Sequence, residues 1–132
     1  RRLRLPYSQA EEMFLRMVFN VVIRNQDDHT KNISFLMDKT GKWTLSPAYD
    51  IGFAYNPKGS WTDTHQMSIN GKFDDITRRD LLVCAAANNI KNAAEIIDKV
   101  CETTAKWPEM AKNCGVPQEM IDARLPYMLL NV

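Results

Sequence analysis

The chain has 132 residues, 45% hydrophobic and 25% charged, which is ordinary for one soluble globular domain with a core of its own. Its formal net charge of +1 argues against a broad basic surface for nucleic acid. We see no membrane-spanning stretch and no signal peptide. The three cysteines, Cys84, Cys101 and Cys114, form no metal-type pair, which fits a reducing cytoplasm.

The first predicted element is a helix over residues 8–24. Ser8 followed by Glu11 indicates a capping box, with Ser8 as the N-cap. Apolar residues cover this helix almost all round, and its polar residues recur every four positions, at Glu12, Arg16, Asn20 and Arg24. Such a helix is expected to be buried, and it leads directly into the next loop.

A β-hairpin is predicted next. Residues 33–37 alternate and are rich in strand formers, residues 38–42 are turn residues, and residues 43–45 return as a second strand. Because a hairpin brings its two ends together, we expect Asp50 to lie close to Asn32 and Asp27.

The remaining chain is predicted to be a polar loop followed by two or three helices. The loop covers residues 53–72, and its His65 is expected to be solvated. Thr77 is expected to cap the first helix, which ends at Asn88. The later helices are predicted over residues 92–107, which Pro108 ends or kinks, and 117–130, which Pro126 interrupts. The predicted fold class is α+β, mostly α-helical, with a small β-hairpin bearing the catalytic and metal residues.

Four polar residues have the spacing that phosphoryl transfer requires: Asp27, His29, Asn32 and Asp50. A kinase catalytic loop has an Asn five residues after its Asp, and a second metal-binding Asp follows a hairpin. Asp27 and Asn32 have that interval, and Asp50-Ile51-Gly52 stands where Asp-Phe-Gly would. Asp27 would accept or orient the proton of an attacking hydroxyl, while Asn32 and Asp50 would offer oxygen ligands to Mg²⁺.

Neighbouring residues in the loop are further candidates. Lys31 could neutralise phosphate charge, and His29 could fix the loop or contact the nucleotide. Asp28 is the adjacent carboxylate, but only Asp27 has the five-residue interval to Asn32. Asp, Asn and His also gather after helices for local reasons, because their side chains bond to nearby backbone. The helix before this loop, the hairpin after it and the Asp-Ile-Gly segment favour catalysis.

On these residues, the region from about Phe14 to Gly52 resembles the C-terminal lobe of the HipA-like serine/threonine kinases, the bacterial toxins of toxin–antitoxin pairs. The matching segments are residues 18–21, 27–32 and 45–51. In that family an Asp-x-His-x-Lys-Asn loop supplies the catalytic base and one metal ligand, and a Leu-x-Pro-x-Tyr-Asp segment supplies the other. The resemblance implies that Asp27 is the base and that Asn32 and Asp50 are the magnesium ligands. Our candidates for contacts with the nucleotide are His29, Lys31 and Tyr49.

The resemblance also implies ATP as substrate, Mg²⁺ as cofactor and a Xre-type DNA-binding antitoxin as partner. It implies contact with DNA only through that antitoxin, and a protein substrate such as an aminoacyl-tRNA synthetase. No glycine-rich phosphate loop and no phosphate-pairing lysine precede the first predicted helix. We therefore expect residues 1–132 to be the catalytic lobe of a longer kinase that lacks its nucleotide-binding N-terminal lobe, and to be inactive alone.

Three other functions remain open from the sequence. A metal-dependent phosphohydrolase or nuclease would use Asp27, His29 and Asp50 around a divalent ion, although His is a poor ligand for Mg²⁺. A DNA-binding helix pair would span residues 78–100, with Arg78 among its phosphate contacts. A non-catalytic scaffold descended from a kinase is the third, and the intact catalytic set argues against it.

Overall fold

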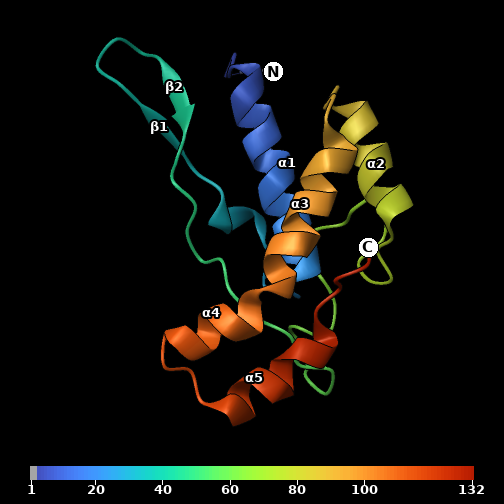
Figure 1. The fold of residues 1–132 in the computed structure, drawn as a ribbon. Coiled ribbons are helices and arrows are strands. Elements are labelled where there is room, and N and C mark those ends of the chain that lie inside the picture. The colour runs from blue at the N-terminus through green and yellow to red at the C-terminus, as the bar shows by residue number, and fades with distance from the viewer. Residues whose placement is uncertain (1–2) are drawn as a thin grey trace.

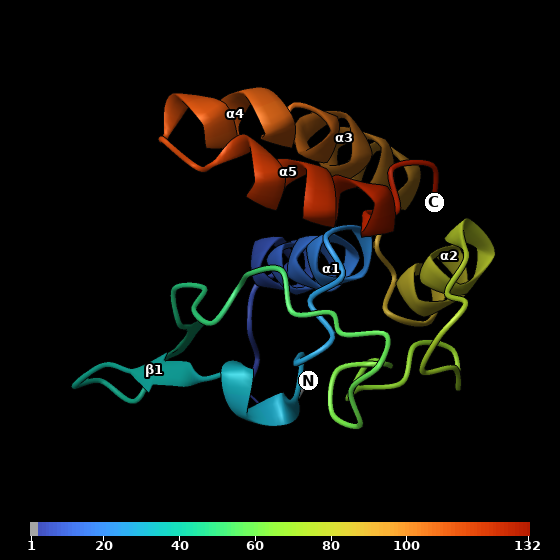
Figure 2. The same cartoon turned by 90° about the horizontal axis from the view of Figure 1, so that it is seen from below.

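The computed structural model describes residues 3–132, and a long helix, α1 (Tyr7–Val22), runs through its centre. Figure 1 shows the hairpin on one side of α1 and helix α2 on the other. Figure 2 shows the C-terminal helices as a layer on one face of α1, with the hairpin and the long loop on the opposite face. The helices after α1 are α2 (Arg78–Ala87), α3 (Ala93–Ala105), α4 (Trp107–Asn113) and α5 (Gln118–Arg124).

Helix α1 starts earlier than predicted and is buried mainly along one face. The expected N-cap at Ser8 is wrong: the helix begins at Tyr7, the N-cap position is Pro6, and no side chain caps it. Proline suits this position because its φ, here −66°, matches the entry to a helix. The residues buried on α1 follow a helical period, and most of its other apolar side chains are half-buried. The buried residues of α1 are Phe14, Val18, Val21 and Val22, and the three valines have no exposed surface.

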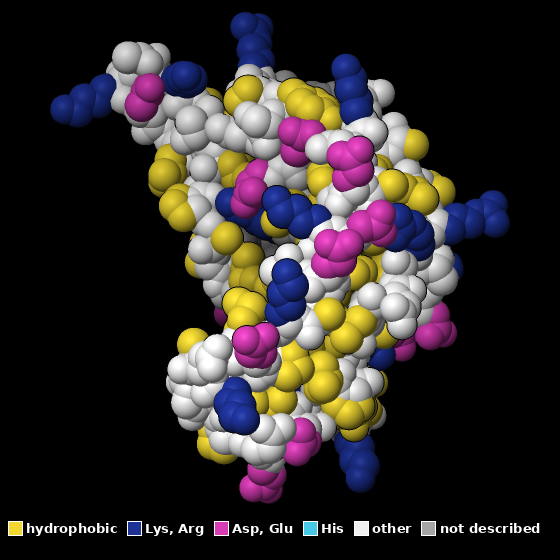
Figure 3. All heavy atoms as spheres, viewed as in Figure 1, with side chains coloured by type: hydrophobic (Ala, Val, Ile, Leu, Met, Phe, Trp, Pro, Cys, Tyr) yellow, Lys and Arg dark blue, Asp and Glu magenta, His cyan; other side chains and the backbone are white. Residues whose placement is uncertain are grey.

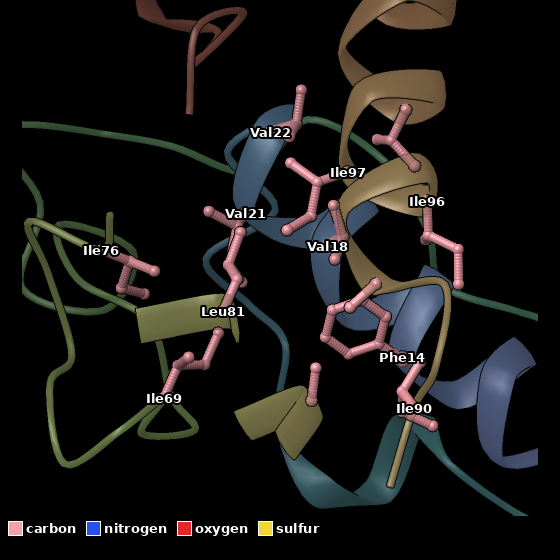
Figure 4. Close-up of a cluster of buried hydrophobic side chains, with 13 residues drawn as sticks. Phe14, Val18, Val21, Val22, Ile69, Ile76, Leu81, Ile90, Ile96 and Ile97 are labelled. Atoms are coloured by element: carbon pink, nitrogen blue, oxygen red, sulfur yellow. The ribbon is translucent and has the colours of Figure 1, made fainter. Parts of the chain in front are cut away.

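The hydrophobic core joins α1 to α3 and α2. Helix α1 packs most extensively against α3, and Figure 4 shows Val18 and Val22 of α1 beside Ile97 of α3. Leu81 of α2 has no exposed surface and closes the cluster together with two loop residues, Ile69 and Ile76. This core holds α1 rigidly, so the loop that follows its C-terminal end starts from a fixed point.

The predicted hairpin is present, with shorter strands. Strands β1 (Phe35–Met37) and β2 (Trp43–Leu45) are antiparallel, and Phe35 lies opposite Leu45. The side chain of Asp38 closes the turn by accepting hydrogen bonds from Thr40 and from the backbone N–H of Lys42. These bonds, with that of the Thr40 hydroxyl the largest effect, lower the pKa of the Asp38 carboxyl.

The C-terminal helices agree with the prediction except in one place. The predicted cap at Thr77 is confirmed, and it takes the form of a capping box in which the Asp80 carboxylate accepts from the backbone N–H of Thr77 at 2.9 Å. Helix α3 ends at Ala105, and an unpredicted helix, α4, begins at Trp107. Pro108 lies in the first turn of α4, where its missing N–H leaves no helical hydrogen bond unmade. The break at Pro126 is confirmed as a 3₁₀ turn after α5. Among residues 3–132, no helix combines the length and apolar character needed to cross a membrane.

Candidate active site

The end of α1 sets the direction of the loop that carries the candidate residues. Arg24 follows the helix with a φ of +59°, in the left-handed region. Its backbone N–H donates to the carbonyl of Val21 at 3.2 Å, and the N–H of Asn25 donates to the carbonyl of Asn20 at 2.8 Å. This pair of bonds is a Schellman motif, which satisfies the last helical carbonyls and turns the chain sharply.

A short parallel bridge then joins the loop to the segment that follows Asp50. Asn25 is paired with Ala54. The backbone N–H of Gln26 donates to the carbonyl of Ala54 at 3.0 Å, and the N–H of Ala54 donates to that of Arg24 at 3.1 Å. The side chain of Asn25 adds bonds to Asn20 Oδ1 (3.0 Å) and to the Asp50 carbonyl (3.2 Å). The loop and the Asp50 segment, remote in sequence, are therefore attached to each other.

Three of the four residues from Asn25 to Asp28 point into the protein. Asn25 and Asp28 are each 3% exposed, and Gln26 is fully buried. The Gln26 amide, oriented to satisfy its neighbours, donates to the carbonyls of Thr62 (2.9 Å) and Asp63 (3.0 Å). Asp27 alone is exposed to solvent.

Asp28 is bound to the long loop after the hairpin. Its Oδ2 lies 2.9 Å from Nδ1 of His65, and its Oδ1 accepts from the backbone N–H of Gln66 at 2.8 Å. The prediction that His65 is solvated is wrong, because this side chain is only 2% exposed. Since both Asp28 oxygens are engaged and buried, Asp27 is the carboxylate of this loop that a reactant can reach.

Asn32 and Asp50 line the same pocket, which confirms that these two residues lie together; Asp28 lines it as well, whereas Asp27 is not among its lining residues. Asn32 ends a 3₁₀ turn (Thr30–Asn32), and its amide N–H donates to the backbone carbonyl of Asp27 at 3.0 Å. Asp50 lies between the end of β2 and the parallel bridge, and its φ of +54° turns the chain at this point. His29 and Tyr49 line this pocket too, together with residues of α1: Met13, Arg16, Met17 and Asn20.

The other predicted nucleotide contacts have partners within the loop. The Tyr49 hydroxyl donates to the carbonyl of Lys31 at 2.8 Å, which braces the turn before β1. Lys31 itself is exposed. His29 is half-buried, and its Nδ1 is buried without a hydrogen-bond partner among the described residues. The volume of this pocket that a water-sized molecule can enter is about 40 Å³. That space suits an ion or a few waters and is too small for a nucleotide.

The oxygen donors of the pocket fit Mg²⁺ only together with phosphate. Mg²⁺ in nucleotide sites is held by one or two protein ligands and the substrate phosphates. Asn32 and Asp50 supply one amide oxygen and one carboxylate, which meets that requirement. Within residues 3–132 no three His, Cys, Asp or Glu side chains could hold a metal by themselves.

The structure weakens the DNA-binding alternative. The Arg78 guanidinium pairs with Asp98 at 2.8 Å and donates to the backbone carbonyl of Val132 at 3.2 Å, so it is engaged within the protein. The Asp98 carboxylate raises the pKa of Arg78. On the face shown in Figure 3, basic and acidic side chains are interspersed, and neither sign forms a continuous field.

Sequence reasoning missed the residues that hold the site together. Arg16 donates to the carbonyl of Ser46 at 3.0 Å, and Asn20 accepts from Asn25, so α1 contacts both the hairpin and the loop through polar side chains. The available signal was the polar line on an otherwise apolar helix, because polar groups on a packed helix need partners. Asp28 and His65 gave no such signal.

The comparisons with known proteins identify the chain by family. No protein with a curated description matches it. The family model of the HipA-like C-terminal domain matches residues 1–108, which include α1, the loop, the hairpin and Asp50. Helix α5 lies beyond the matched residues. Since the match covers most of the sequence, the chain belongs to the HipA-like C-terminal domain family.

Proposed function

We propose that the chain is the catalytic lobe of a protein kinase that moves the γ-phosphate of ATP to a serine or threonine hydroxyl. The observation that carries the proposal is the contrast between two adjacent carboxylates. Asp28 lines the pocket of Asn32 and Asp50, but it is buried with both oxygens bonded, whereas Asp27 is exposed and its backbone carbonyl accepts from the Asn32 amide. A base must reach the proton of an incoming hydroxyl, and Asp27 meets this condition.

In this proposal Asp27 orients the hydroxyl and takes its proton. The Asn32 amide donates to the Asp27 carbonyl and so fixes the backbone of the base, and Asn32 also lines the pocket. Asn32 and Asp50 are the residues that would hold Mg²⁺, and the ion would neutralise charge on the phosphates when bound. Exposed Lys31 offers a cation to the nucleotide, and His29 a ring at the pocket wall.

Membership of the family supports a wider proposal about the whole protein. We infer a nucleotide-binding lobe outside this chain, a role as the toxin of a toxin–antitoxin pair, and a DNA-binding antitoxin partner. An aminoacyl-tRNA synthetase is the proposed protein substrate. These proposals rest on the match to the HipA-like C-terminal domain family and not on a docking surface.

The test is transfer of labelled γ-phosphate by the full-length protein carrying this chain, compared with its Asp27→Asn variant. The substitution keeps the size of the side chain and removes its basicity. General-base catalysis contributes about 10²- to 10⁴-fold, so we expect a loss of at least about 10²-fold in kcat, with the melting temperature unchanged.

The matched control is Asp122→Asn, an exposed carboxylate on α5, which we expect to transfer phosphate at the parent rate. Transfer by Asp27→Asn at the rate of this control would remove Asp27 from the chemistry. Hydrolysis of ATP without transfer to any hydroxyl would favour the phosphohydrolase instead.

A further inference from the structure

A buried pair joins the catalytic loop to a segment 37 residues further along the chain. Nδ1 of His65 and Oδ2 of Asp28 lie 2.9 Å apart, and the two side chains are 2% and 3% exposed. The other Asp28 oxygen accepts from the backbone N–H of Gln66, with the N–H of Met67 at a longer 3.5 Å. A buried carboxylate is costly without such partners, so the loop and the segment hold each other in place.

The same segment is attached on the other side of Asp27. Gln26 donates from its buried amide to the backbone carbonyls of Thr62 and Asp63. Gln26 and Asp28 are both held inward by these bonds, and Asp27 between them is exposed to solvent. The orientation of Asp27 is thus set by contacts that Asp27 does not make.

We propose that His65 is a positioning residue for the phosphoryl transfer: by holding Asp28, it fixes the direction in which Asp27 projects. The inference rests on the proposed function and adds a residue to it. Met67, two residues after His65, lines the pocket of Asn32 and Asp50, so the segment also forms part of the pocket wall. Displacement of a reacting group by about 1 Å can cost about 10²-fold in rate, which is why a residue without contact to the reactants matters.

Two amide substitutions separate positioning from simple packing. His65→Asn places a side-chain N–H at the position of Nδ1 and can still donate to Asp28. His65→Gln carries its N–H further out, near the position of Nε2, and leaves Asp28 Oδ2 without this donor. In the full-length protein we expect His65→Gln to lower kcat by about 10-fold or more with KM for ATP within about twofold, and His65→Asn to restore most of kcat. Lys58→Ala, an exposed change outside the segment, is the control.

Amide hydrogen exchange provides a readout that does not depend on activity. The Gln66 N–H should exchange slowly in the parent and in His65→Asn, and faster in His65→Gln, since its acceptor Asp28 is loosened. If His65→Gln does not fold, His65→Leu, which fills the buried volume without a donor, replaces it.

The outcomes are distinct. A parent protein that transfers no phosphate to any substrate overturns the proposed function, and the role of His65 falls with it. An active parent whose folded His65→Gln variant keeps the parent kcat overturns only the positioning role. Equal losses in the Asn and Gln variants also overturn it, because the donor would then be irrelevant.

Discussion

Asp27 and Asp28 are neighbours in the chain and lie in opposite environments. Asp28 is enclosed by His65 and Gln66, and Asp27 meets solvent. The difference comes from the bonds that hold Gln26 and Asp28 inward on either side of Asp27, and not from the carboxylates themselves. The exposure of Asp27 therefore depends on contacts made by its neighbours.

Asn25 is a buried residue whose side chain ties the catalytic loop to the Asp50 segment, so its loss should loosen the candidate site. Its side-chain N–H groups join Asn20 of α1 to the carbonyl of Asp50, and it is 3% exposed. We expect Asn25→Ala to lower the free energy of unfolding by about 1–2 kcal/mol, because two acceptors lose their donor. Denaturant unfolding measures this change.

The control is Asn113→Ala, an exposed position at the end of α4, which should stay within about 0.5 kcal/mol of the parent. Equal stability of the two variants would mean that Asn25 does not tie the loop to Asp50.

The sequence predicted contacts between residues correctly where the residues are close together in the chain or are joined by a hairpin. The interval from Asp27 to Asn32 and the hairpin were enough to predict that Asn32 and Asp50 lie together, and they line one pocket. The burial of His65 could not be predicted, because its partner is 37 residues away and the loop between has no periodicity. The roles proposed for Asp27, Asn32 and Asp50 remain predictions.

At the scale of elements, the start of α2 is the most strongly capped helix end. Asp80 is 3% exposed and accepts from Lys72, from Asn70 and from both the N–H and the hydroxyl of Thr77. These bonds, that of Lys72 the largest, hold the pKa of the Asp80 carboxyl far below its ordinary value of 3.8.

This shift predicts how stability depends on pH. Because the pKa of Asp80 is lower in the folded state than its unfolded value of 3.8, the ionised carboxylate stabilises the fold fully at pH values above 3.8. This stabilisation is lost as the pH falls from 3.8 toward the folded pKa. We expect Asp80→Asn to lower the melting temperature at pH 7 and to flatten its fall between about pH 4 and pH 2.

The neighbouring exposed Asp75→Asn should keep the parent curve, since Asn tolerates the positive φ of 49° found there. If the melting temperature of Asp80→Asn fell with decreasing pH as steeply as that of the parent, other carboxyls would govern acid unfolding.

Elements were predictable where a strong local signal exists. The Thr77 box and the turn at residues 38–42 have such signals, and both are present. The Ser8 box failed because Pro6 already starts the helix, and α4 was missed because Pro108 was taken as an end when it is also a good first-turn residue. The sequence around Pro108 is compatible both with the end of one helix and with the first turn of another.

For the molecule as a whole, α1 is the part on which the candidate site is built. One face of α1 packs on α3 in the core, and its polar residues Arg16 and Asn20 contact the hairpin and the loop on the other side. The C-terminal region contributes as well, since the backbone N–H of Leu129 donates to the carbonyl of Val22 at 2.8 Å. The mostly helical α+β class followed from the sequence, whereas these cross-contacts did not.

The central claim is that the loop and the Asp50 segment form one site for a nucleotide and a divalent ion. Paramagnetic broadening by Mn²⁺ with ATP, read in the NMR spectrum of this chain, tests it directly and detects weak binding. The account predicts selective broadening at the Asn32 side-chain amide and the Asp50 N–H, sharp signals in α4, and loss of the effect in Asp50→Asn. Broadening centred instead on the acidic groove of Glu11, Glu12 and Glu95 between α1 and α3 would contradict it.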